Sequence, residues 1–244
     1  MTESEWLGGD LSAQLRFAQA RLSARRQRLL AVAMCRAAEP EHADVRAALD
    51  TIEAFADRAA PPADVERARQ RCREVAQRAY EQYRTALDAG GARGVPPIVE
   101  TAWVASFAAN TPVPLAQIAD RLAGIDDDLL DLVQPAIWDP DPISQAIRRP
   151  PARSDLVAPL RALVFEVAGN PFREVPFDPA WRTDTARALA RQMYDRREFG
   201  AMPILADALQ DAGCDSDDVL THCRDARQVH ARGCWVLDAV LGNA

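Results

Sequence analysis

The residues best suited to chemistry gather near the C-terminal end of the sequence. Three of the five cysteines and two of the three histidines fall between positions 214 and 234: Cys214, His222, Cys223, His230 and Cys234. Thiolate and imidazole together are typical ligands of tetrahedral zinc. One interpretation is therefore a structural zinc ion bound by Cys214, Cys223, His230 and Cys234, with His222 as an alternative ligand. The spacing differs from that of a standard zinc finger or ribbon.

Two other interpretations of the same segment stay open. Small thiols are among the most buried side chains and pack well in helical cores, so packing explains such residues at least as readily as a metal does. In a catalytic arrangement, a thiolate would be activated by an imidazole that a carboxylate orients. The candidates for that arrangement are His222, His230 and Cys223, with Asp225 or Asp238 as the orienting group.

These residues need a helical hairpin to bring them together. A last helix is predicted from about His230 to Leu241, which would place His230 and Cys234 on one face, one turn apart. His222 and Cys223 would end the preceding helix, which Asp215 is predicted to cap.

The whole sequence predicts an all-α fold, a multi-helix bundle in two packed halves. We expect an N-terminal helical bundle over residues 1–133, a Pro-rich connector over 134–153 and a compact helical module over 154–244. The connector carries five prolines, which fix φ and lack an amide donor, so it cannot be regular helix throughout. Predicted helix starts include Asp10 or Ser12, Ser23, Pro61–Pro62 and Thr183, and a short helix is predicted over 126–132.

Composition excludes several function classes. All 29 basic residues are arginines, so the chain can form no lysine Schiff base and has no P-loop lysine. A net charge of −7 argues against nucleic-acid binding, with the face of Arg21, Arg25, Arg26 and Arg28 as the best counter-evidence. No apolar run is long enough for a membrane span, and the N-terminus is acidic, so we expect a cytoplasmic protein without a membrane partner.

A second region is rich in prolines and aromatic residues. The segments Asn170–Arg173 and Asp178–Trp181 are predicted loops, and they could meet the last helix. Such a meeting point could be a small-molecule pocket or only a well-packed corner. The pocket candidates are Arg173, Asp178, Trp181 and Trp235, with His222 and His230 as further polar groups.

The C-terminal strings resemble those of an uncharacterised, much-duplicated helical family of planctomycete-type bacteria. The resemblance is carried by the segments 169–173, 178–181, 203–209, 211–214, 222–224 and 232–235, and more weakly by Glu5-Trp6-Leu7 and by the run from Arg28 to Cys35. It is weak across 85–155. Where a typical member has two adjacent cysteines, this chain has Met34-Cys35. The resemblance implies a helical accessory protein and adds no catalytic residue.

The sequence therefore favours a non-enzymatic helical module that binds another protein, with a zinc site in 214–234. The alternatives are a small-molecule-binding enzyme that uses a Cys/His site in the C-terminal module, and nucleic-acid binding through the Arg21–Arg28 face.

Overall fold

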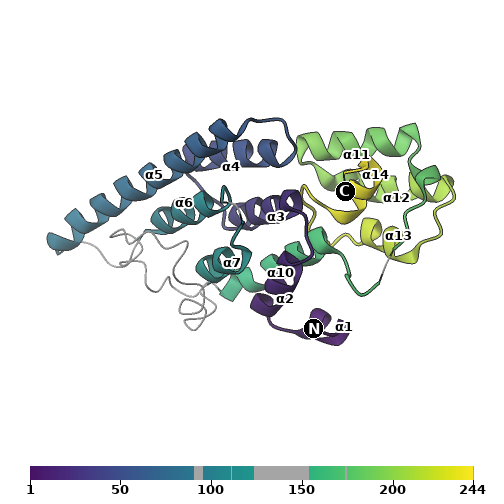
Figure 1. Ribbon diagram of the computed structural model, residues 1–244, viewed down its shortest axis with the longest axis horizontal. Helices are drawn as coiled ribbons and strands as arrows, with labels where there is room; N and C mark the ends of the chain where they lie inside the picture. Colours follow the sequence, from purple (N-terminus) through teal and green to yellow (C-terminus); the bar gives the residue numbers. More distant parts are fainter. Residues whose placement is uncertain (91–95, 111, 124–153, 174, 244) are drawn as a thin grey trace. The chain divides into compact units, whose positions relative to one another are not determined.

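Every regular element in the described part of the chain is a helix, which confirms the predicted all-α fold (Figure 1). The computed structural model describes residues 1–90, 96–110, 112–123, 154–173 and 175–243. None of the helices within these ranges has both the length and the apolar character that a membrane crossing requires.

The chain divides into two units. One consists of Asp10–Leu160, and the other of Met1–Gly9 together with Arg161–Ala244. This division differs from the predicted one at the N-terminus, because the first nine residues belong with the C-terminal part of the chain. Helix α10 (Ser154–Ala168) begins in one unit and ends in the other. The predicted connector over 134–153 and the predicted helix over 126–132 lie outside the described residues.

The Asp10–Leu160 unit is a set of packed helices in which α3 contacts α4, α4 contacts α5, and α5 contacts α6. Asp10, one of the two predicted caps, and Ser23, as predicted, cap α2 and α3 by accepting hydrogen bonds from backbone amides. The run from Leu29 to Cys35 on α3 is buried on all sides. The elements are α2 (Leu11–Gln19), α3 (Ala24–Ala37), α4 (Ala43–Ala56), α5 (Pro62–Asp88), α6 (Pro97–Phe107) and α7 (Leu115–Ala123).

Three arginines of the proposed nucleic-acid face make contacts within this unit. Arg25 pairs with Asp57 at 2.9 Å, and Arg28 is buried. The Arg21 guanidinium lies 3.5 Å from the centre of the Phe17 ring. These contacts favour a structural role for the arginines over phosphate binding.

The second unit contains one helix that the sequence analysis missed. Helix α1 (Glu3–Gly8) begins with a reciprocal pair of hydrogen bonds between Thr2 and Glu5. Its Trp6 is fully buried and meets the edge of the Phe165 ring at a centroid distance of 5.3 Å. An aromatic residue at that position stabilises a helix that is too short to be stable alone.

The remaining helices of this unit enclose one apolar core (Figure 1). Thr183 caps α11, as predicted, and Gly213 ends α12 with a φ of +90°, a left-handed value that favours glycine. The elements are η1 (Pro179–Trp181), α11 (Asp184–Arg196), η2 (Phe199–Ala201), α12 (Met202–Asp211), α13 (Asp217–Arg224) and α14 (Trp235–Leu241).

Two local predictions for this unit were wrong. The last helix begins at Trp235 and not near His230, because Gly233 takes a φ of +90° and interrupts any helix that would pass through it. His230 and Cys234 therefore do not share a helix face. Ser216, not Asp215, caps α13, and its hydroxyl accepts the Val219 amide.

Candidate metal centre

Four ligand-bearing side chains of the second unit converge on one buried point. They are Glu166, His222, His230 and Cys234, and their ligand atoms all lie within 4.8 Å of one another. The side chain of Glu166 is fully buried, and those of His222 and His230 are only 10% and 9% exposed. Cys234 is fully buried. This set of oxygen, nitrogen and sulfur atoms can hold a metal ion.

Glu166 lies in the last part of α10 among apolar residues. Its neighbours Leu163, Val164 and Val167 are all buried in the same helix. Both carboxylate oxygens accept hydrogen bonds. Oε1 lies 3.2 Å from His230 Nδ1 and from the Ala231 amide nitrogen, and Oε2 lies 3.3 Å from His222 Nε2. A buried carboxylate needs such donors, since leaving its charge unsatisfied is costly.

His222 is presented by the last turn of α13. Burial of Val219, Leu220 and Cys223 fixes the inner face of this helix, and His222 Nε2 comes within 3.3 Å of Cys234 Sγ. The His222 ring also meets the edge of the Trp235 ring at a centroid distance of 5.2 Å. These contacts hold the imidazole in one orientation.

The other two ligands come from the segment 225–234 between α13 and α14. The start of α14 leaves Cys234 at the N-cap position, where a turn from Ala231 carries it into the core. Arg232 holds the segment to the end of α11 by donating to the carbonyl oxygens of Tyr194 and Asp195. These contacts fix the part of the segment that follows His230.

Burial dominates the electrostatics of these groups. It lowers the pKa of His222, an effect that the Glu166 carboxylate opposes and the neighbouring His230 reinforces. Burial, aided by the Glu166 charge, raises the pKa of the Cys234 thiol well above its usual range. Without a cation, therefore, the Cys234 thiol keeps its proton and the His222 imidazole stays neutral.

No protein family, curated protein or solved structure matches the chain.

The four-residue group differs from the predicted ligand set. It includes His230 and Cys234 as expected and His222, which was the alternative ligand, but Glu166 was missed. Cys214 and Cys223 are not members of the group, because both pack into the apolar core of the unit. Burial raises the pKa of Cys223 to about 12 and also raises that of Cys214, so neither thiol is poised to act as a nucleophile.

One sequence signal could have pointed to Glu166. It is the one acid within the apolar stretch from Leu156 to Val167, at a helix position whose neighbours predict burial. A lone carboxylate on a buried helix face requires a partner, and the excess of cysteine and histidine in 214–234 offers one.

Each predicted pocket residue has a contact within the unit that accounts for its position. Arg173 donates to the Glu3 carboxylate of α1 at 2.8 Å, and Asp178 caps η1 by accepting the Ala180 amide. Trp181 is buried in the core, with its ring 5.2 Å from that of Phe177. Trp235 packs on His222. These contacts are an ion pair, a helix cap and the packing of aromatic rings.

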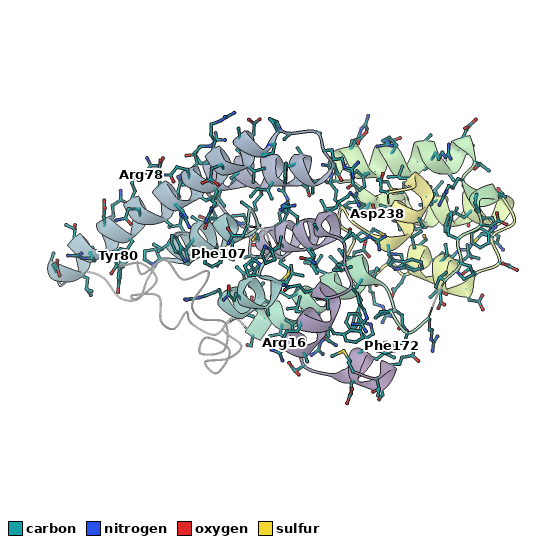
Figure 2. The ribbon with its side chains drawn as sticks, in the orientation of Figure 1. Arg16, Arg78, Tyr80, Phe107, Phe172 and Asp238 are labelled. Atoms are coloured by element: carbon teal, nitrogen blue, oxygen red, sulfur yellow. The ribbon has the colours of Figure 1, made fainter. Side chains whose placement is uncertain are left out.

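Of the two carboxylates proposed to orient an imidazole, Asp225 is bonded within its own turn and Asp238 is buried. Asp225 Oδ1 accepts the Arg227 amide at 3.0 Å. Asp238 is 1% exposed on α14, where Figure 2 labels it. The group that contacts both imidazoles is Glu166.

Proposed function

We propose that the chain is a non-enzymatic helical module whose second unit is held together by one structural zinc ion, bound by Glu166, His222, His230 and Cys234. The observation that carries the proposal is the convergence of these four ligand atoms within 4.8 Å at a buried point. They come from α10, α13 and the segment before α14, so one ion would join three parts of the unit.

The distances suit zinc without a large rearrangement. With metal–ligand bonds of about 2.0–2.3 Å, the ligand atoms of a tetrahedral zinc site lie roughly 3.3–3.8 Å apart. The contacts of His222 Nε2 with Cys234 Sγ and with Glu166 Oε2 are both 3.3 Å long, and His230 Nδ1 lies 3.2 Å from Glu166 Oε1. These three contacts are close to the spacing that the ion needs, whereas the group as a whole spreads to 4.8 Å, so ion binding would draw the ligands closer together.

The charges of the ligands suit a divalent cation. Glu166 and a deprotonated Cys234 contribute two negative charges, and two neutral imidazoles contribute none. A divalent ion thus gives a neutral centre, whereas a monovalent or trivalent ion would leave a net charge in a buried site, at a cost of several kcal/mol. One thiolate and two imidazoles favour zinc over magnesium or calcium, which prefer oxygen ligands.

The same geometry contains the elements of a Cys–His–Glu catalytic arrangement, which is the competing function. His222 lies 3.3 Å from both Cys234 Sγ and Glu166 Oε2. A nucleophile must be reached by its substrate, however, and Cys234 is fully buried. Burial also raises the pKa of its thiol, the opposite of what activates a catalytic cysteine. Four closed ligand positions are typical of structural and not catalytic zinc.

A partner protein would use the surface that this centre supports. The segment 225–234 exposes Arg227, whose side chain is 93% accessible, and Val229, which is 42% accessible. Fixing this segment through His230 and Cys234 reduces the ordering cost that a partner must meet on binding. Co-purification with and without a chelator tests this role.

The metal content of the purified protein tests the zinc proposal. We expect one zinc ion per chain in protein prepared without chelator or added metal, and loss of that ion in Cys234→Ala and His222→Ala. Cys214→Ala and Cys223→Ala are matched controls, since they remove buried thiols of the same unit that lie outside the group, and both should keep the metal. A metal-free wild type, or equal loss in the controls, would refute the proposal.

A further inference from the structure

Gln228 contacts the candidate metal centre without belonging to it. Its Nε2 atom lies 3.2 Å from Glu166 Oε2 and 3.5 Å from the Val229 carbonyl oxygen. An ionised carboxylate only accepts hydrogen bonds, so the amide must face Glu166 with its nitrogen. Each amide hydrogen of Gln228 then has an acceptor, and these two hydrogen bonds hold the side chain in place.

Glu166 is consequently contacted by two amide donors of the 225–234 segment and by the imidazoles of His222 and His230. Oε1 accepts the Ala231 amide and contacts His230, while Oε2 accepts Gln228 and contacts His222. One donor to each oxygen comes from groups that cannot bind a cation. The remaining lone pairs are directed toward the two imidazoles, where the ion would lie.

We infer that Gln228 is a positioning residue of the metal centre, acting through Glu166. The inference rests on the proposed zinc site and extends it to the group that orients its carboxylate. Residues that orient metal ligands through hydrogen bonds typically change metal affinity by 10–100-fold when they are replaced. The backbone of Gln228 lies outside any helix, and its side chain contacts helix α10 at Glu166.

A cobalt titration of the full chain tests this role. Co²⁺ replaces zinc in such sites, and its visible absorption reports the ligand geometry directly. Gln228→Met keeps the length of the side chain and removes the donor, and Gln228→Glu replaces the donor with a second carboxylate. Gln210→Met is the matched control, because Gln210 accepts a hydrogen bond from Arg224 on the surface of the same unit and does not contact Glu166.

We expect Gln228→Met to bind Co²⁺ roughly 10–100-fold more weakly, with an altered spectrum, and Gln228→Glu to give an altered spectrum because its added carboxylate can itself reach the ion. Gln210→Met should bind as the wild type does, and the urea midpoints of the three metal-free variants should be similar. Unchanged affinity and an unchanged spectrum in Gln228→Met would refute this inference while leaving the proposed function standing. The inference would also be refuted if Gln228→Met bound Co²⁺ more weakly with an unchanged spectrum and its metal-free fold lost a matching amount of stability. Failure of the wild type to bind Co²⁺ would instead refute the proposed function, and this inference with it.

Discussion

Replacing Glu166 with glutamine distinguishes two roles for this side chain, that of a metal ligand and that of a member of a hydrogen-bonded network. The substitution keeps the shape of the side chain and removes its charge. In the metal-free protein, glutamine can still accept from the Ala231 amide, and it relieves the burial of a carboxylate whose ionic neighbours are imidazoles. We therefore expect a change in stability of no more than about 1 kcal/mol without metal, of either sign.

The zinc-bound protein should respond very differently. At a free zinc concentration of about 1,000 times Kd, binding stabilises the wild type by about 4 kcal/mol. For a chain of this size that corresponds to a rise in Tm of roughly 8–16 °C. If the loss of an anionic ligand weakens binding by about 100-fold, the same zinc concentration stabilises Glu166→Gln by only about 1.4 kcal/mol, or roughly 3–6 °C.

The assay is thermal unfolding of wild type and Glu166→Gln in zinc-buffered and in chelator-treated solution. Glu53→Gln is a suitable control, because Glu53 is also a buried acid, 4% exposed, but lies in the other unit near Arg36. It should change Tm equally in both solutions. The reasoning would be refuted if Glu166→Gln lowered Tm by the same amount with and without zinc.

Three further predictions follow from burial, charge and backbone conformation. All five cysteines are free and buried, so none should react with a thiol reagent until denaturant is added; one rapidly reacting thiol would favour the catalytic alternative. Hydrogen bonding to Asn170 is the main cause that lowers the pKa of Glu3 below its ordinary 4.5, so this contact stabilises α1 above pH 4.5 and is lost as the pH falls through the lowered pKa; amide protection in α1, taken relative to the intrinsic exchange rate at each pH, should fall on acidification by more in the wild type than in Glu3→Gln, where only the Thr2–Glu5 cap is still lost. Gly169→Ala should destabilise the protein by about 1–2 kcal/mol in urea unfolding, because φ is +64° and the new methyl group would meet the Trp235 ring at 3.4 Å, whereas Gly8→Ala, which meets nothing within 4 Å, should have little effect.

Much of the helical fold follows from local signals in the sequence. The caps at Ser23 and Thr183 and the prolines at the start of α5 were predicted at the observed positions, and Asp10 was one of two predicted caps of α2, because each of these signals acts on backbone within a few residues of itself. Helix α1 was missed although Thr2 and Glu5 form a local capping box, because a helix this short also needs the packing of Trp6 on Phe165, a contact between residues far apart in the sequence.

The candidate metal centre was predicted only in part, for two reasons. Cysteine and histidine are rare enough that their clustering in 214–234 is visible, and three members of the group come from that cluster. Glu166 lies 64 residues before His230, so its link to the cluster depends on the fold, and the one local sign of it is its place as the single acid in the apolar stretch from Leu156 to Val167. The turn at Gly233 also changed the geometry, since it replaced a shared helix face with a loop that folds back on α10.

The burial of Glu166 gives the strongest physical reason to expect a cation. Among the described residues, its ionic contacts within 4 Å are with His222 and His230, and no arginine is among them. Protonating an imidazole would neutralise the carboxylate, but both rings are about nine-tenths buried, so a charged ring would itself be poorly solvated. A divalent ion avoids this cost, because it binds both imidazoles in their neutral form and balances the charges of Glu166 and Cys234 together. On this argument we expect the four ligands to be more stable with the ion than as a network of hydrogen bonds alone.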